Sequence, residues 1–257
     1  MGNLDALKYC LDWNHSRPRL ARRDRRAFLR TSSATAAAAF FGLGSASRLL
    51  YAAALSKAQR DKLTPDEIIA MMKKGNLRFR TGRETPHDYL AQQRASASGQ
   101  YPAAVILSCI DSRASAETVM DLGIGDVFNA RVAGNVVNGD ILGSMEFACK
   151  IAGAKVVLVM GHTSCGAIKG AIDKARLGNL TGLLAKIQPA VDATSYEGER
   201  TGQNYSFVDA VARKNVELTL GEIRKGSVLL AELETGGAVK LAGAMYNIRT
   251  ASVDFFI

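Results

Sequence analysis

Two short segments of the sequence combine side chains that bind transition metals. The first reads Cys-Ile-Asp-Ser-Arg over 109–113, and the second reads His-Thr-Ser-Cys over 162–165. Two thiolates, from Cys109 and Cys165, and one imidazole, from His162, suit Zn²⁺ and leave a fourth position for water or a carboxylate. The spacing of His162 and Cys165 lets a turn that opens a helix present both side chains to one ion. A helix N-terminus at this point also favours a thiolate.

Each of these residue types also has a purely structural interpretation. A single cysteine after an apolar strand usually packs in the core, and a single histidine is more often hydrogen-bonded than metal-bound. Here two such segments each follow a predicted strand, and this coincidence favours a metal site over the structural interpretations. Cys149 lies in the middle of a predicted helix with no histidine nearby, so we predict a small buried hydrophobe there. His87 lies in a polar loop and is predicted to be solvated.

Both metal-binding segments follow short apolar runs that are typical of buried strands, at 103–108 and 155–160. Ligands collect outside the carboxyl ends of the strands in an open parallel sheet, so the two segments can converge. Further strands are predicted at 126–130 and 239–246, with a hairpin partner at 251–256. Helices are predicted at 65–80, 88–95, 139–152, 164–176, 181–193 and 204–224. This alternation predicts an α/β fold, with a mostly parallel sheet of four to five strands flanked by helices.

Composition places the chain among ordinary globular proteins. It has 257 residues, of which 47% are apolar and 22% charged, and this excludes a disordered, collagen-like or multispanning membrane protein. Four cysteines are too few for a disulfide scaffold. The net charge is +9, but residues 1–54 hold nine lysines and arginines against three acidic residues. The remainder is close to balance, so no nucleic-acid partner is indicated.

The basic leader has the pattern of a targeting segment. Arg25-Arg26, followed by Phe28-Leu29-Arg30, resembles the twin-arginine export signal, and a soft apolar run rich in alanine and glycine follows over 31–47. A mobile basic arm or a retained membrane anchor is the alternative. We expect cleavage near Ala46 or Ala54, export to the periplasm, and no stable membrane anchor afterwards. The expected division is a leader at 1–54 and a single catalytic domain at 55–257.

The paired motif resembles that of the β-class carbonic anhydrases. Other matching segments lie at 99–102 (Gly-Gln-Tyr-Pro), 131–135 (Arg-Val-Ala-Gly-Asn), 178–180 (Gly-Asn-Leu) and 243–246 (Gly-Ala-Met-Tyr). The resemblance covers about residues 64–256. It implies a four-stranded parallel core sheet with an added antiparallel strand. It also implies a homodimer or a dimer-based oligomer.

The resemblance also implies roles for individual residues. Cys109, His162 and Cys165 would hold one Zn²⁺ per protomer, and Asp111 would orient the nucleophile while Arg113 keeps it ionised. Asp111 can also swing inward as a fourth zinc ligand. Ile106 stands where members that close in this way have a Trp, so we expect the open form at neutral pH. The substrate site is expected to include the following residues: Gln100, Phe128, Ala133, Phe147 and Gly166.

The activity implied is reversible hydration of CO₂ to bicarbonate by a zinc-bound hydroxide. A hydrolase of carbonyl sulfide or carbon disulfide on the same fold is one alternative, since the motif around the metal does not separate these substrates. A zinc-binding protein without turnover is the other, although it would not need Gln100, Asp111 and Arg113 around an open position. Phe147 in place of a Tyr, and Val132 in place of an Asn, depart from the family pattern.

Overall fold

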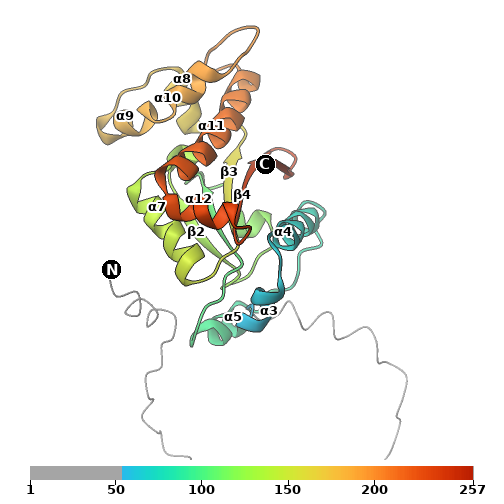
Figure 1. The fold of residues 1–257 in the computed structure, drawn as a ribbon. Coiled ribbons are helices and arrows are strands. Elements are labelled where there is room, and N and C mark those ends of the chain that lie inside the picture. Colours follow the sequence, from blue (N-terminus) through green and yellow to red (C-terminus); the bar gives the residue numbers. More distant parts are fainter. Residues whose placement is uncertain (1–53, 257) are drawn as a thin grey trace, which may run out of the picture.

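The computed structural model describes residues 54–256, which form a five-stranded sheet in the order β2-β1-β3-β4-β5. The first four strands are parallel and β5 is antiparallel to β4, so the predicted fold class is confirmed. Figure 1 shows the strands between α4 (Pro65–Arg80) on the right and α7 (Gly139–Glu146), α11 (Tyr205–Gly226) and α12 (Val228–Thr235) on the other side. The strands are β1 (Ala104–Ser108), β2 (Val127–Arg131), β3 (Val156–His162), β4 (Lys240–Tyr246) and β5 (Val253–Phe256).

The two central strands carry the segments with the metal-binding residues. Every residue of β1 and β3 is buried, and both strands are rich in Val, Ile and Leu, as expected for parallel strands covered on both faces. Ser108 at the end of β1 pairs with Met160 of β3 and with Arg131 of β2. The register therefore brings the carboxyl ends of three strands to one edge of the sheet.

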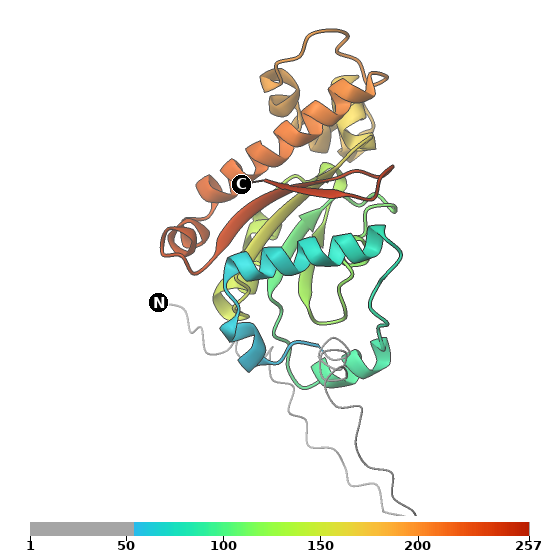
Figure 2. The same ribbon diagram turned by 90° about the vertical axis from the view of Figure 1, so that its right-hand side faces the viewer.

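Helices cover both faces of the sheet, and Figure 2 shows α4 and α11 on opposite sides of it. One apolar cluster joins Val105 and Val157 to α7, α8, α11 and α12, and the other joins Ile106 and Leu158 to α4 and α6. The helices are α3 (Lys57–Lys62), α4 (Pro65–Arg80), α5 (Tyr89–Ser96), α6 (Ala116–Val119), η1 (Ala133–Asn135), α7 (Gly139–Glu146), η2 (Phe147–Ile151), α8 (Gly166–Ile172), α9 (Gly178–Ala185), α10 (Gln188–Ala193), α11 (Tyr205–Gly226) and α12 (Val228–Thr235).

Local chemistry explains where the helices begin and where they differ from expectation. The helix predicted at 65–80 is confirmed, and Thr64 and Glu67 form a capping box at its start. The single helix predicted at 181–193 is wrong, because Pro189 lies in the first turn of α10 and the chain breaks there into α9 and α10. The helix predicted at 139–152 changes at Phe147 from α-helical to a π-helical turn, η2.

The prediction that His87 is solvated is wrong. Its side chain is only 10% exposed, and its Nε2 lies 3.0 Å from a carboxylate oxygen of Asp121. Its Nδ1 lies 3.1 Å from the amide nitrogen of Gln92. A partner 34 positions away in the sequence holds this histidine inside a loop that otherwise looks polar.

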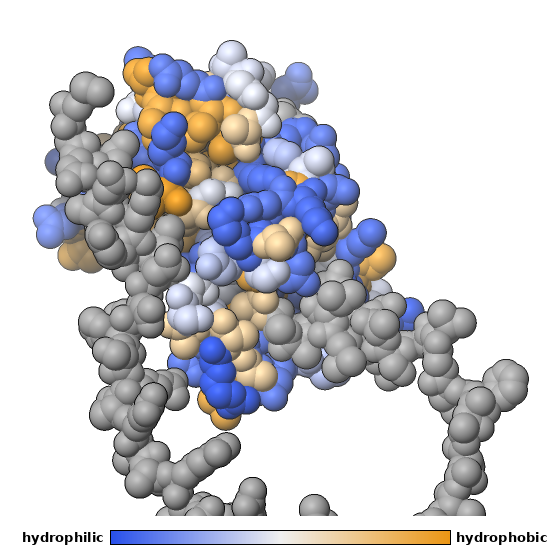
Figure 3. Space-filling model, turned by 60° about the horizontal axis from the view of Figure 1, so that its bottom comes forward, coloured by the Kyte–Doolittle hydropathy of each residue, from blue (hydrophilic) through white to orange (hydrophobic). Residues whose placement is uncertain are grey.

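The twin-arginine motif and the apolar run after it fall in residues 1–53, which lie outside the described residues. None of the helices in the described range has both the length and the apolar character needed to cross a membrane. Hydrophilic residues cover much of the described surface on the side of α3 and α5, with smaller apolar areas between them (Figure 3).

Candidate metal centre

Three predicted ligands converge at the carboxyl edge of the sheet. Cys109 follows β1, His162 ends β3, and Cys165 is the N-cap of α8. Because β1 and β3 are adjacent and parallel, their ends bring the two loops together. The ligand atoms all lie within 4.8 Å of one another, and the two sulfurs are 3.9 Å apart. The exposed fractions of the three residues are 4%, 1% and 1% in chain order, so water is largely excluded from them.

This donor set fits zinc. Two Zn–S bonds of about 2.3 Å in a tetrahedron place the sulfurs about 3.8 Å apart, close to the separation found here. The Nδ1–H of His162 donates to the carbonyl of Thr163 at 2.9 Å, which leaves Nε2 as the free acceptor. That Nε2 is buried and has no hydrogen-bond partner among residues 54–256. A buried acceptor beside two sulfurs is costly unless a cation takes its lone pair.

The pKa values of the Cys109 and Cys165 thiols are shifted in opposite directions. The adjacent Cys165 thiol, the neighbouring His162 and the Gly134 N–H, which donates to the sulfur at 3.3 Å, lower the pKa of Cys109 to about 4. The neighbouring Cys109 sulfur, together with burial, raises the pKa of Cys165. Cys109 therefore ionises first, and a bound dication would stabilise the second thiolate.

Cys149 behaves differently from the two ligand cysteines. It lies in the apolar core, as predicted, and burial alone raises its pKa to about 12. All three cysteines of the described residues are free. Cys149 is therefore a packing residue.

Asp111 is oriented beside the ligands by Arg113. The guanidinium donates from Nε and Nη2 to the two carboxylate oxygens at 2.9 and 2.7 Å, and the Arg113 backbone N–H donates at 3.0 Å. These bonds hold the pKa of Asp111 well below its usual range. One carboxylate oxygen lies 3.9 Å from His162 Nε2, so the carboxylate borders the space between the ligands while it stays paired to Arg113.

Arg131 supports the first loop from β2, a role that the sequence reasoning missed. Its Nε donates to the carbonyl of Cys109 at 2.9 Å and its Nη2 to the carbonyl of Asp111 at 2.6 Å. The sequence did contain a signal for this role, because Arg131 is the first residue of the 131–135 segment that resembles the family. Gly134 in that segment has φ +68°, and a Cβ there would come within 2.6 Å of Ile187. Glycine at this position therefore allows the Gly134 N–H to approach the Cys109 sulfur without backbone strain.

The residues predicted to line the substrate site fall into two groups. Ala133 begins η1 beside Gly134, and Gly166 begins α8 beside Cys165, where an added Cβ would meet nothing within 4 Å. Gln100 precedes β1, so the length of that strand, about 16 Å, separates it from Cys109.

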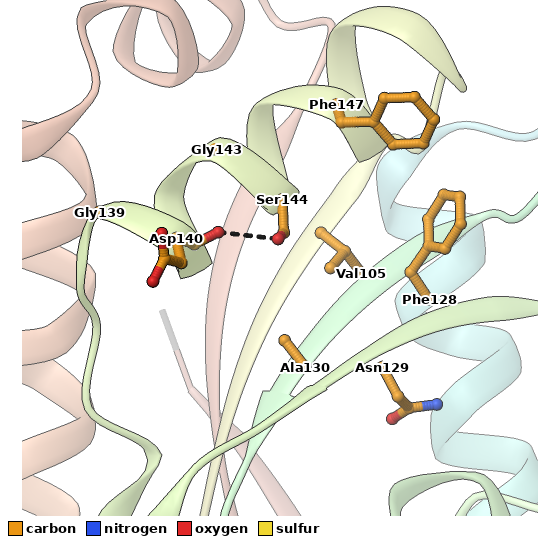
Figure 4. A pocket seen from close by; sticks show the side chains of 9 residues that line it. All are labelled: Val105, Phe128, Asn129, Ala130, Gly139, Asp140, Gly143, Ser144 and Phe147. Atoms are coloured by element: carbon orange, nitrogen blue, oxygen red, sulfur yellow. Dashed lines mark hydrogen bonds between the residues drawn. The ribbon is translucent and has the colours of Figure 1, made fainter. Parts of the chain in front are cut away.

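Phe128 and Phe147 line a different hollow, shown in Figure 4. Their rings meet edge to face with centroids 6.1 Å apart, over a pocket of about 570 Å³ between β2 and α7. Phe128 pairs with Val105, four residues before Cys109, which corresponds to about 13 Å along the strand. None of the three zinc-binding candidates lines this pocket.

Comparison with known proteins agrees with this geometry. The family model described as carbonic anhydrase matches residues 104–253. Carbonic anhydrase 2 of Mycobacterium tuberculosis is 34% identical over 183 residues, which cover 69% of this chain and 86% of that protein. The carbonic anhydrase of Mycolicibacterium smegmatis is 31% identical over 185 residues, which cover 71% of this chain and 89% of that protein.

Solved structures share the fold. A β-carbonic anhydrase from Sordaria macrospora, described as tetrameric, superposes with a TM-score of 0.55 at 23% identity, covering 62% of this chain and 83% of that one. A Coccomyxa β-carbonic anhydrase bound to acetazolamide superposes with a TM-score of 0.56 at 22% identity, covering 62% and 73%. The family model and the mycobacterial relatives therefore show that the chain belongs to the carbonic anhydrase family, and the superpositions show that it has the β-class fold.

Proposed function

We propose that this protein catalyses the zinc-dependent, reversible hydration of CO₂ to bicarbonate. The observation that carries the proposal is the convergence of three buried ligand atoms with a carboxylate held beside them by Arg113. A protein that only stored zinc would have no use for an oriented, ionised Asp111 at the border of the site. The family relationship favours CO₂ over carbonyl sulfide or carbon disulfide as the substrate.

Each side chain of the site has a separate role in the proposed reaction. Cys109, His162 and Cys165 would hold Zn²⁺, which would act there as a Lewis acid and make a nucleophile available near neutral pH. Asp111, at the border of the ligand space, would accept a hydrogen bond from the nucleophile and orient it toward the carbon of CO₂. Arg113 keeps Asp111 ionised and fixes its orientation through two parallel bonds. The buried surroundings keep competing water away from the ligand atoms.

We further propose that the apolar part of the substrate site is completed by a second copy of the chain. Phe128 on β2 and Phe147 at the start of η2 lie too far from the carboxyl edge of the sheet to reach the ligands of their own protomer. Because β2 is an edge strand with a hollow beside it, a partner's zinc loop can approach there. This arrangement agrees with a dimer or dimer-based oligomer.

Subunit mixing tests the shared site. His162→Ala removes a ligand, and Phe147→Arg fills the hollow with charge. If the site is shared, mixing the two inactive variants gives heterodimers with one intact site, and activity returns to about a quarter of the wild-type value. Restoration of no activity, with heterodimers present, would place the whole substrate site in one chain.

We also propose that residues 1–54 direct export by the twin-arginine route, followed by cleavage near Ala46 or Ala54 to release a single catalytic domain, 55–257, into the periplasm. That route carries folded proteins, so zinc and thiolates could combine in the reducing cytoplasm first. Changing Arg25 and Arg26 to Lys should leave an unprocessed, active cytoplasmic form. Unaltered export of the double variant would exclude this route.

The activity itself is tested on purified protein. We expect one zinc per protomer by elemental analysis, together with CO₂ hydration that far exceeds hydrolysis of carbonyl sulfide or carbon disulfide. If the zinc-containing protein hydrolyses carbonyl sulfide or carbon disulfide faster than it hydrates CO₂, the alternative hydrolase is favoured. Zinc with no turnover of any of the three substrates would leave the non-catalytic zinc protein.

A further inference from the structure

Helix α11 carries two polar side chains whose hydrogen bonds lead to the two ligand loops, one directly and one through Gly134. The helix packs along β3 and β4, and most of its inward residues are apolar. Asp209 and Asn215 are exceptions, six residues apart on the helix. Each makes a hydrogen bond to the backbone of a different loop, so the contacts of both can be followed to the metal ligands.

Asp209 holds the second loop. Its Oδ1 accepts the backbone N–H of Ser164 at 2.7 Å. Ser164 lies between His162 and Cys165 and has φ +56°, in the left-handed region that a residue with a side chain adopts only when neighbouring contacts hold it there. The bond to Asp209 therefore supports the turn that brings His162 and Cys165 to one point.

The other side of the same loop is fastened to β4 and to the segment that follows it. The Thr163 N–H donates to the carbonyl of Tyr246 at 2.9 Å, and the Ile248 N–H donates to Thr163 Oγ1 at 3.1 Å. These bonds fix the carbonyl of Thr163 that receives the Nδ1–H of His162. Asp209 acts next to this anchored residue, on the Cys165 side of the turn.

Asn215 holds the first loop through an intermediate residue. Its Nδ2 donates to the carbonyl of Gly134 at 2.8 Å, and Asn215 is 3% exposed. The N–H of Gly134 in turn donates to the sulfur of Cys109 at 3.3 Å. The position of Asn215 is thereby linked to the orientation of the Cys109 thiolate.

We propose that α11 sets the distance between the two halves of the metal centre, with Asp209 as the positioning residue for the His162–Cys165 turn and Asn215 as the positioning residue for Cys109. The proposal rests on the proposed zinc-dependent function. Neither residue touches the ligand space itself. Removing partners that orient metal ligands typically weakens metal binding about 10- to 100-fold.

The first experiment measures zinc affinity by chelator competition, together with the melting temperature of the zinc-free protein. Asp209→Leu should weaken zinc binding about 10- to 100-fold. Asp209→Asn keeps an oxygen acceptor and should remain within about threefold of wild type, since the hydrogen bond and not the charge does the positioning. Asp173→Leu is the matched control, because Asp173 also accepts one backbone N–H, from Gly202 at 2.8 Å, away from the ligand loops. It should leave zinc affinity unchanged.

The second experiment replaces zinc with Co²⁺, whose absorption reports ligand geometry and thiolate coordination. Asn215→Ala should alter the Co²⁺ spectrum, whereas Asn76→Ala should lower only the melting temperature. Asn76 is a matched control because it is equally buried and donates to the carbonyls of Val119 and Ala251, both at 2.9 Å. If Asn215→Ala does not fold, the Asp209 series still decides the matter.

Three results would overturn the proposal. The first is zinc affinity in Asp209→Leu equal to wild type. The second is equal weakening in Asp209→Leu and Asp209→Asn, which would show that charge and not the hydrogen bond matters. The third is equal weakening in Asp173→Leu, which would show a general stability effect. None of these readouts requires turnover, so wild-type protein that binds zinc but does not hydrate CO₂ would refute the proposed function separately.

Discussion

The two ends of the sheet contain the same kinds of side chain in opposite states. At the carboxyl end, His162 Nε2 lies 3.9 Å from a carboxylate oxygen of Asp111 and has no hydrogen-bond partner within the described part of the chain. Near the amino ends of β1 and β2, His87 lies 3.0 Å from Asp121. That carboxylate also accepts bonds from Arg78 and from the backbone and side chain of Thr85.

The difference separates a binding site from a structural cluster. Around Asp121 the donors and acceptors satisfy one another, so the cluster stabilises the loop between α4 and α5 and offers nothing to a ligand. Around His162 the buried Nε2 lies beside two sulfurs and receives no hydrogen bond from the described residues, an arrangement that a bound cation would stabilise. Similar residues therefore have a function at one end and a structural role at the other.

The largest contrast should come from the two histidines. His162→Ala removes one of three fixed ligands and should abolish both zinc content and CO₂ hydration. Cys165→Ser should do the same. His87→Ala should keep zinc and activity and lower the free energy of unfolding by about 1–2 kcal/mol through lost hydrogen bonds. Elemental analysis, hydration assays and denaturant titration check this, and loss of zinc from His87→Ala would remove the distinction.

The two aspartates should separate activity from stability. Asp111→Asn should retain zinc and fold normally but lower kcat/KM about 100-fold or more, since the amide no longer offers an ionised acceptor to the nucleophile. Asp121→Asn should keep kcat/KM and lower the free energy of unfolding by about 2 kcal/mol, because Arg78 and His87 lose a charged partner. Steady-state kinetics and urea unfolding of both variants are the measurements. Equal stability losses would contradict the comparison.

A smaller effect is expected at Cys149, which lies in the core between the two ends of the sheet. Cys149→Ala should keep the full zinc content and activity and cost about 1 kcal/mol of stability, as expected for a small buried side chain. Zinc analysis beside thermal unfolding measures both effects. A Cys149 variant that lacks zinc would invalidate the assignment of ligands.

The smallest effect concerns the pH dependence of stability at the amino end. Burial raises the pKa of Asp126, while its carboxylate accepts the Gly123 N–H at 2.7 Å. The folded state therefore binds this proton more tightly than the unfolded state, whose pKa is about 3.9, and stability from this group falls as pH rises through the folded-state pKa. Asp126→Asn should be more stable relative to wild type at pH 7 than at pH 4, by less than about 1 kcal/mol. Denaturation curves at both values test the trend, and the reverse order would contradict it.

The ligand set and most of the elements could be predicted because their signals are local. Cys109 directly follows one apolar run and the turn of His162 and Cys165 follows the other, and the capping box at Thr64 marks the start of α4. The break at Pro189 was also readable, since proline at that place ends the preceding helix.

Contacts between distant segments could not be predicted in this way. The pairing of His87 with Asp121, and of Asn215 with Gly134, 81 positions away, follows from how α4 and α11 pack on the sheet. The separation of Phe128 from the ligands depends on strand register, which an isolated apolar run does not reveal.

Both ligand-bearing loops leave central strands, each hydrogen-bonded to neighbours on two sides. In terms of amide hydrogen exchange, such strands belong to the slowest, most protected part of a domain, whereas the loops open with smaller free energies. The metal can then leave and return when the loops open, while the strands of the sheet keep their hydrogen bonds. The loops can also acquire new residues during evolution without a change in strand register, so the chemistry at this edge can diverge while the fold persists.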